Sequence, residues 1–250
     1  MNDQLSLRRL ALVLRNDFVR THRSALLISG TAALVALVVS LGGAYDGDVG
    51  QGPTFYEVFF IAMLFAWGTI ATSVCFSDLY GRGTNAAFLL LPASALEKTV
   101  SRLLLHTVGL IAYLLLLTTL LSWLLEGINT VWIDERRELF SPLDELGWSL
   151  LPHFLVAQAL FFLGAAWFRK FQFVKTVGAV FAIQIALSVI AVLLLRLIGP
   201  IPCLNANCYE LPWLDWVTDA APFVYFYLLP PFCWFVARLR VTETQVSHGI

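Results

Sequence analysis

Residues 103–125 read LLLHTVGLIAYLLLLTTLLSWLL, an apolar run without Asp, Glu, Lys or Arg. About 20 mostly apolar residues form a helix long enough to cross ~30 Å of hydrocarbon. Five further stretches along the chain meet this requirement. The six candidate spans are roughly residues 25–43, 55–77, 103–125, 147–168, 174–197 and 220–237. The sequence therefore predicts an all-α membrane protein with six transmembrane helices.

Composition agrees with this class. Of the 250 residues, 59% are hydrophobic and 13% are charged, whereas soluble domains are about 25% charged. The net charge of -1 gives no indication of nucleic-acid binding. Because the loops between the spans are short, we expect a single transmembrane domain covering residues 1–250.

The basic residues alternate in density from one side of the spans to the other. If the N-terminus is cytoplasmic, all sixteen Lys and Arg residues except Arg136, Arg137 and Arg196 fall on the inner side. Cytoplasmic loops of membrane proteins carry an excess of Lys and Arg. The pattern predicts a multi-pass membrane protein with both termini in the cytoplasm.

Residues 5–23 have the pattern of an amphipathic helix at the inner interface. Its apolar stripe consists of Leu7, Leu10, Ala11, Leu14 and Phe18. Its opposite face carries Arg9, Asn16, Arg20 and Arg23. Basic residues continue to Arg23 before any apolar run, so we expect no cleavable signal peptide. Two interpretations stay open: a generic interfacial anchor, or a connecting helix that also contacts a cytoplasmic partner.

The inner loop 78–101 reads DLYGRGTNAAFLLLPASALEKTVS. After Pro92, the segment Ser94-Ala95-Leu96-Glu97 fits a capping box, in which the Ser hydroxyl and the Glu carboxylate each accept from the other's backbone amide. The sequence predicts a helix that starts at Ser94 and runs through Lys98 and Arg102 into the third span. The alternative is that this segment is only a well-capped entry to that span.

The outer segments and the polar residues of the spans give weaker signals. The acidic loop 126–146 is interpreted as a solvated face, with a cation site as the less favoured alternative. Glu57 near the outer end of the second span is a candidate buried acid, either in a substrate or proton role or as a structural group. Gln158 and Gln184 lie within spans and are expected to join helices by hydrogen bonds or to line a cavity.

The outer segment 199–219 mixes Pro and Trp, which is typical of an interfacial hairpin. Within it, Cys203 and Cys208 are disulfide candidates if the compartment is oxidising, and two free thiols are the alternative. No phosphate-binding loop, H-E-x-x-H or G-x-S-x-G motif occurs. The four histidines have no metal-ligand spacing. We expect no catalytic residues and no metal bound by this chain.

The segment FSDLYGRGTNAAFLLLPASALEKTVSR, residues 76–102, resembles the permease subunits of type-2 ABC transporters. Members of this family related to bacterial exporters and immunity transporters often have an Asp at the end of the second span and a stretch like LLPASxLEK before the third. The matching residues are Asp78, Leu90, Leu91, Pro92, Ala93, Ser94, Leu96, Glu97 and Lys98. The motif covers about 20 residues, and the six-span topology extends the resemblance to the whole chain.

The resemblance implies a location in the bacterial cytoplasmic (inner) membrane and a function there. Two permease copies, identical or related, would pair with two soluble ABC ATPase subunits, and those subunits would bind ATP and Mg²⁺. The coupling helix would contain Pro92, Ser94, Leu96, Glu97, Lys98 and Arg102, and the 5–23 helix would brace the same contact. The implied activity is ATP-driven export of an amphipathic substrate such as a peptide antibiotic, lipid or drug, with no ATPase site in this chain.

A second class of function stays open from the residues alone. A non-transporting membrane sensor or scaffold would bind a cytoplasmic partner through the same 94–102 helix and would need no cavity. An intramembrane enzyme is disfavoured because the spans lack paired catalytic residues. An ion-coupled transporter is disfavoured because Glu57 is nearly alone and no inverted repeat is evident.

Overall fold

The computed structural model describes residues 6–45, 55–81, 91, 93–132, 139–141, 145–198 and 219–248. These residues contain no strand, and six of their helical segments are long and apolar enough to cross a membrane. The predicted all-helical class, with six helices long and apolar enough to span a membrane, is thereby confirmed. The predicted hairpin at 199–219 lies outside the described residues.

The helices follow one another with short breaks. Their bounds are α1 Leu7–Tyr45, α2 Phe55–Ser73, α3 Ser77–Tyr80, α5 Ala95–Leu104, the π-helix η1 Leu105–Gly109, α6 Leu110–Trp132, α7 Glu145–Trp167, α8 Gln172–Ile198, the π-helix η2 Val224–Leu228 and α10 Leu229–His248. The helix α5 therefore continues through η1 into α6 without interruption, as the sequence predicted for the entry to the third span.

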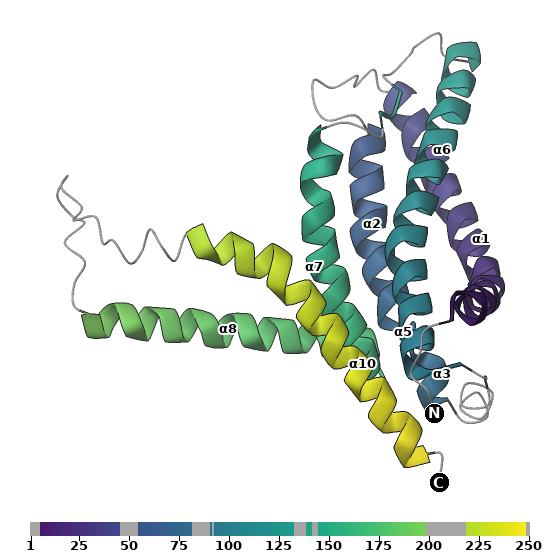
Figure 1. Cartoon of the computed structure of the whole chain (residues 1–250). Coiled ribbons are helices and arrows are strands. Elements are labelled where there is room, and N and C mark those ends of the chain that lie inside the picture. The colour runs from purple at the N-terminus through teal and green to yellow at the C-terminus, as the bar shows by residue number, and fades with distance from the viewer. Residues whose placement is uncertain are drawn as a thin grey trace.

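Four helices form a bundle, in which α2 lies beside α6 and α7 and the second half of α1 lies along α6 (Figure 1). Its core is aromatic and aliphatic, with Tyr56, Leu64, Leu114 and Phe154 almost completely buried. A second buried cluster, which includes Phe76 and Phe162, lies where α10 crosses α7.

The first turns of α1 point in a different direction from the rest of the helix. Figure 1 shows them end-on, in dark purple, while the second half of α1 is seen from the side. Leu7 and Phe18 are exposed, whereas Val13 and Asp17 are buried. The exposed apolar side chains fit the expected interfacial stripe, and the buried residues show that α1 also packs against α5.

The connection between α7 and α8 turns the chain sharply. After this turn, α8 leaves α7 steeply and projects away from the bundle (Figure 1). The turn contains Phe171 in the left-handed region, with φ 52°, which few non-glycine residues adopt. From Val180 to Leu194 every side chain of α8 is exposed. Such an apolar helix needs lipid or another protein around it.

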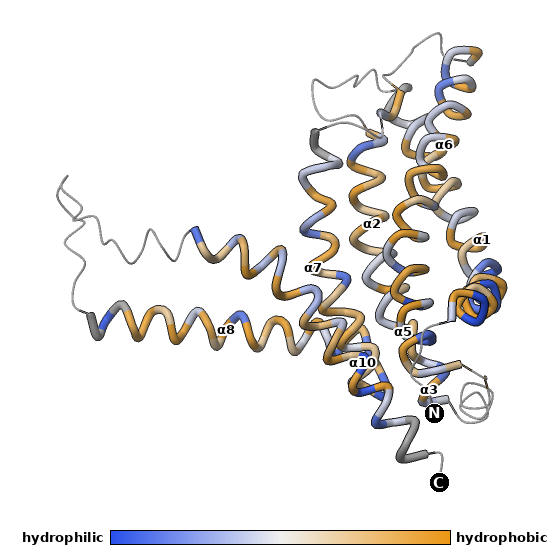
Figure 2. The backbone as a smooth tube through the Cα atoms, viewed as in Figure 1, coloured by the Kyte–Doolittle hydropathy of each residue, from blue (hydrophilic) through white to orange (hydrophobic). Residues whose placement is uncertain are grey.

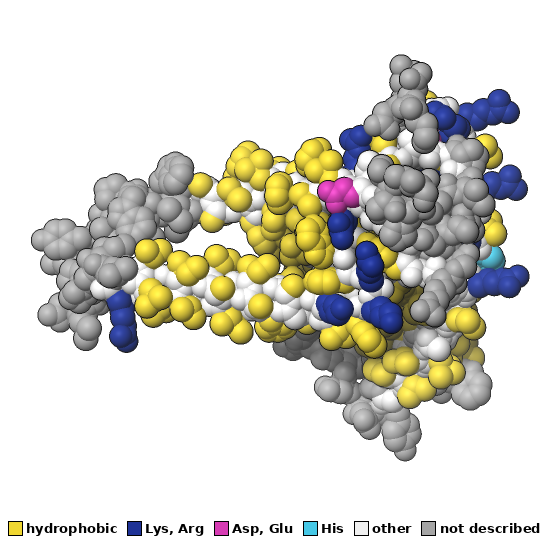
Figure 3. Space-filling model, turned by 90° about the horizontal axis from the view of Figure 1, so that it is seen from below, with side chains coloured by type: hydrophobic (Ala, Val, Ile, Leu, Met, Phe, Trp, Pro, Cys, Tyr) yellow, Lys and Arg dark blue, Asp and Glu magenta, His cyan; other side chains and the backbone are white. Residues whose placement is uncertain are grey.

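Polar and apolar residues separate along the molecule. Figure 2 shows hydrophobic residues along most of α2, α6 and α8, with hydrophilic ones on the first turns of α1 and the last turns of α10. The view from below in Figure 3 shows Lys and Arg gathered at the end of the bundle that holds these segments. This clustering agrees with the charge pattern of the sequence, and the cytoplasmic location of that end stays a prediction.

Candidate functional site

The start of α5 has the predicted capping box. The Glu97 amide donates to Ser94 Oγ at 3.2 Å, and the Ser94 amide donates to Glu97 Oε2 at 2.9 Å. Ser94 itself has the extended backbone of an N-cap residue. The boundary of this helix was therefore predicted correctly from four residues of sequence.

Glu97 also holds the start of α1. Its Oε1 accepts a hydrogen bond from the Ser6 amide at 2.9 Å and lies 3.3 Å from Nε of Arg9. One carboxylate thus caps the starts of two helices, although Ser6 and Glu97 are 91 positions apart in sequence. The two backbone amides, of Ser6 and Ser94, and the Arg9 guanidinium lower the pKa of Glu97. The carboxylate is therefore held in its charged form.

A second set of charges ties α1 and α5 to the end of α2. Asp78 Oδ2 lies 3.3 Å from Nη1 of Arg20 and 3.4 Å from Nη2 of Arg102. The Arg102 guanidinium also donates to the Cys75 carbonyl and lies over the Phe76 ring at 5.2 Å. Charge-assisted hydrogen bonds, which are stronger than neutral ones, thereby join α1, α3, α5 and the turn that follows α2.

The predicted coupling residues face into the protein rather than outward. Glu97, Lys98 and Arg102 are 0%, 3% and 5% exposed. Leu96 keeps partial exposure, and Pro92 lies outside the described residues. Any contact made by α5 with another protein would therefore use Leu96 and its neighbours, while the three charged residues fix the helix in place.

The residues of the predicted polar face of the N-terminal helix also differ in whether they contact the rest of the protein. Arg9 and Arg20 contact Glu97 and Asp78 with partly exposed side chains. Asn16 is partly buried and Arg23 is exposed. Of the four residues, two therefore brace α1 against the rest of the site.

Comparison with known proteins leaves the family open. No protein-family model matches the chain, and neither curated proteins nor solved structures give a match.

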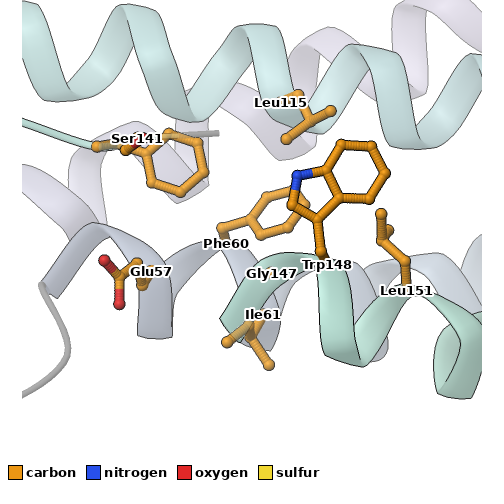
Figure 4. A pocket seen from close by; sticks show the side chains of 9 residues that line it. Glu57, Phe60, Ile61, Leu115, Ser141, Gly147, Trp148 and Leu151 are labelled. Carbon is orange, nitrogen blue, oxygen red and sulfur yellow. The ribbon is translucent and has the colours of Figure 1, made fainter. Parts of the chain in front are cut away.

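Glu57 is buried at the opposite end of the bundle. It borders a cavity of about 30 Å³, room for about one water molecule, together with Phe60, Trp148 and Leu151. Figure 4 shows the Glu57 carboxylate and the Trp148 ring toward opposite sides of this group, with the Phe60 ring between them. A cavity of this size holds no amphipathic substrate, so the geometry favours the structural role for Glu57.

The two glutamines have different environments. Gln158 is completely buried, and its Oε1 accepts from Nε1 of Trp234 at 3.3 Å, while its Nε2 has no partner among the described residues. This bond joins α7 to α10, as expected for a helix-joining glutamine. Gln184 is exposed on α8, so within the described residues it neither joins helices nor lines a cavity. That expectation was wrong because α8 stands apart from the bundle.

The sequence interpretation missed a buried polar network at the C-terminal end of α6. Glu126 was assigned to a solvated loop, but α6 continues to Trp132 and Glu126 is 5% exposed. Its Oε1 accepts from the Tyr56 hydroxyl at 2.6 Å and from Nδ2 of Asn129 at 3.3 Å, and the same Nδ2 donates to Ser40 Oγ at 3.1 Å. The i,i+3 spacing of Glu126 and Asn129 was the signal for one buried helix face.

The remaining candidates concern cysteines and metals. Cys203 and Cys208 lie outside the described residues, whereas Cys75 and Cys233 are free thiols. Among the residues that the structure describes, no group of three or more His, Cys, Asp or Glu side chains is arranged to hold a metal ion.

Proposed function

We propose that the chain is the membrane-spanning subunit of an ATP-driven ABC exporter and forms the path for an amphipathic substrate. A soluble ABC ATPase would supply ATP and Mg²⁺ binding, and a second permease copy, identical or related, would complete the transporter. The proposal rests on the sequence resemblance of residues 76–102 and on the arrangement of α5 and α1.

The observation that carries the proposal is the shared capping of α1 and α5 by Glu97. A helix transmits a push only if its ends are fixed to the elements that must move. Here the Ser6 amide, the Ser94 amide and the Arg9 guanidinium meet one buried carboxylate. A force on the outer surface of α5 would therefore reach α1 and, through the Arg102–Asp78 contact, the end of α2.

The first test is co-purification from the native membrane in mild detergent. We expect a stoichiometric soluble protein with a phosphate-binding loop. A stable complex without such a protein would contradict the exporter and favour the sensor or scaffold function.

The second test perturbs the surface of α5 without removing its internal contacts. Leu96→Arg places a charge on a partly exposed position and is expected to abolish the stimulation of the ATPase by the permease in proteoliposomes. Thr242→Arg is the matched control, because Thr242 is exposed on α10 and lies on no part of α5. Equal ATPase stimulation in the two variants would refute the assignment of α5 as the coupling helix.

A further inference from the structure

A charged hollow lies between the first half of α1, the end of α2 and the start of η1. Its volume is about 370 Å³, and its walls include Asp17, Arg20, Asp78 and Arg102. The carboxylates and guanidiniums of these residues contribute equal numbers of negative and positive charges. Hydroxyl groups complete the polar wall; they belong to Thr21, Ser24 and Ser77.

An apolar hollow of about 340 Å³ adjoins the charged one. The shared walls consist of Thr21, Ala25, Trp67, Ala71, Leu105 and His106. An open groove of about 540 Å³ on the other side of Phe18 shares Phe18, Leu105 and Gly109 with the apolar hollow. Because neighbouring spaces share lining residues, we treat the three together as one path, with the charged hollow at one end and two apolar branches beyond it.

His106 marks the boundary between the charged and the apolar parts. It is 8% exposed, lines both hollows and has no hydrogen-bond partner among the described residues. It belongs to η1, the π-helical turn that interrupts the third span. π-helical turns of this kind occur frequently at functional sites.

We infer that this path binds a membrane phospholipid whose headgroup carries both a phosphate and an ammonium group, as in phosphatidylethanolamine. A purely anionic headgroup would face the two carboxylates, and a purely cationic one would face the two guanidiniums. The phosphate would lie beside Arg20 and His106, and the ammonium beside Asp78. The two acyl chains would follow the two apolar branches on either side of Phe18.

The size and position of the path support a lipid. Ligand sites typically measure about 300–1,000 Å³ and combine apolar walls with a few placed polar groups. Phe18 and Val108, which border the groove, are exposed, so the branches open to the side of the molecule. The inference goes beyond the proposed exporter and holds whether or not an ATPase binds this chain.

The test measures lipid binding to the full-length protein by native mass spectrometry in detergent. Phosphatidylethanolamine is titrated against phosphatidylglycerol, which has the phosphate but no ammonium group. We expect a clear preference for phosphatidylethanolamine. Arg20→Gln should weaken its binding about tenfold, since a hydrogen bond to a charged group is lost. Arg23→Gln is the matched control, because Arg23 is exposed and lies outside the three lining sets.

A second pair of variants tests the apolar branches. Gly109→Leu fills their junction, and a Cβ at Gly109 meets only ordinary contacts, at 3.5 Å from Leu105 and 3.7 Å from the Leu104 carbonyl. Gly127→Leu on α6, the helix that continues from η1, is the control, because a Cβ at Gly127 meets nothing within 4 Å. We expect loss of lipid binding in Gly109→Leu alone. Three results would overturn the inference. These are equal binding of the two lipids, equal effects in a variant and its control, and co-purification of a phosphate-free amphiphile in place of a phospholipid.

Discussion

Replacing Glu97 by Gln should loosen the start of α1 while the rest of the bundle stays folded. The carboxylate accepts hydrogen bonds from the amides of Ser6 and Ser94, both at 2.9 Å. A hydrogen bond to a charged group contributes about 1.5–3 kcal/mol and a neutral one about 0.5–1.5 kcal/mol. In Gln, one oxygen becomes an NH₂ group that faces a donor, and the other loses its charge. We expect the local contact to weaken by about 2–3 kcal/mol.

Hydrogen exchange of the peptide covering residues 6–14 measures this change directly. Because about 1.4 kcal/mol corresponds to a factor of ten, exchange should accelerate roughly 30-fold or more. Glu243→Gln is the control, since the Glu243 side chain is 67% exposed and pairs with Arg240 one turn away on α10. Such surface pairs contribute at most about 1 kcal/mol. Unchanged exchange in Glu97→Gln, or equal acceleration in the control, would refute the shared capping of the two helices.

The same contact has a defined pH dependence. The pKa of Glu97 is lowered from its ordinary value of 4.5 in the folded protein. A carboxyl group with a lowered pKa stabilises the fold fully above its ordinary pKa, and this contribution is lost as the pH falls through the lower, folded-state value. Protection of residues 6–14, corrected for intrinsic exchange, should therefore be constant above about pH 4.5. A decline between pH 7 and 5 that disappears in Glu97→Gln would contradict this sign.

Two further predictions concern packing and the outer polar network. A Cβ at Gly164 would lie 2.9 Å from Cβ of Thr176, so Gly164→Ala should destabilise the α7–α8 contact by about 1–3 kcal/mol in a denaturant titration. Gly147→Ala on the same helix, with nothing within 4 Å, should have little effect, and an equally large loss there would exclude the close contact as the cause. Tyr56→Phe removes a donor at 2.6 Å from the buried Glu126 carboxylate and should cost about 1–3 kcal/mol; an unchanged midpoint would show that the network contributes nothing to stability.

The sequence predicted those features that depend on local patterns. Six apolar runs gave the six long helices, because bilayer thickness sets the required length. The Ser94–Glu97 spacing gave the start of α5, because both partners of a capping box lie within one turn. Local patterns could not place the second partner of Glu97, since Ser6 lies 91 positions away.

Other features could not be predicted because tertiary packing decides them. Charged side chains are rarely buried unless they are paired. The sequence therefore suggested that Glu97, Lys98 and Arg102 lie on the exposed face of the helix. The direction of α8 depends on the left-handed Phe171 and on the close approach of Gly164 to Thr176. Neither leaves a periodic pattern in the sequence.

The proposed coupling to an ATPase and the proposed lipid site both involve α5, but they use different residues of it. The outer surface of α5 would transmit force, and its inner residue Arg102 borders the charged hollow. A push on α5 would reach α1 through Glu97, and α1 contributes Asp17 and Arg20 to that hollow. A ligand shifts a conformational equilibrium only by its difference in affinity for the two states. A bound lipid would therefore oppose the movement of α1 if it binds the starting conformation more tightly, and favour the movement if it binds the final conformation more tightly. If both proposals hold, Arg20→Gln should change how ATPase stimulation depends on phosphatidylethanolamine, and Arg23→Gln should not.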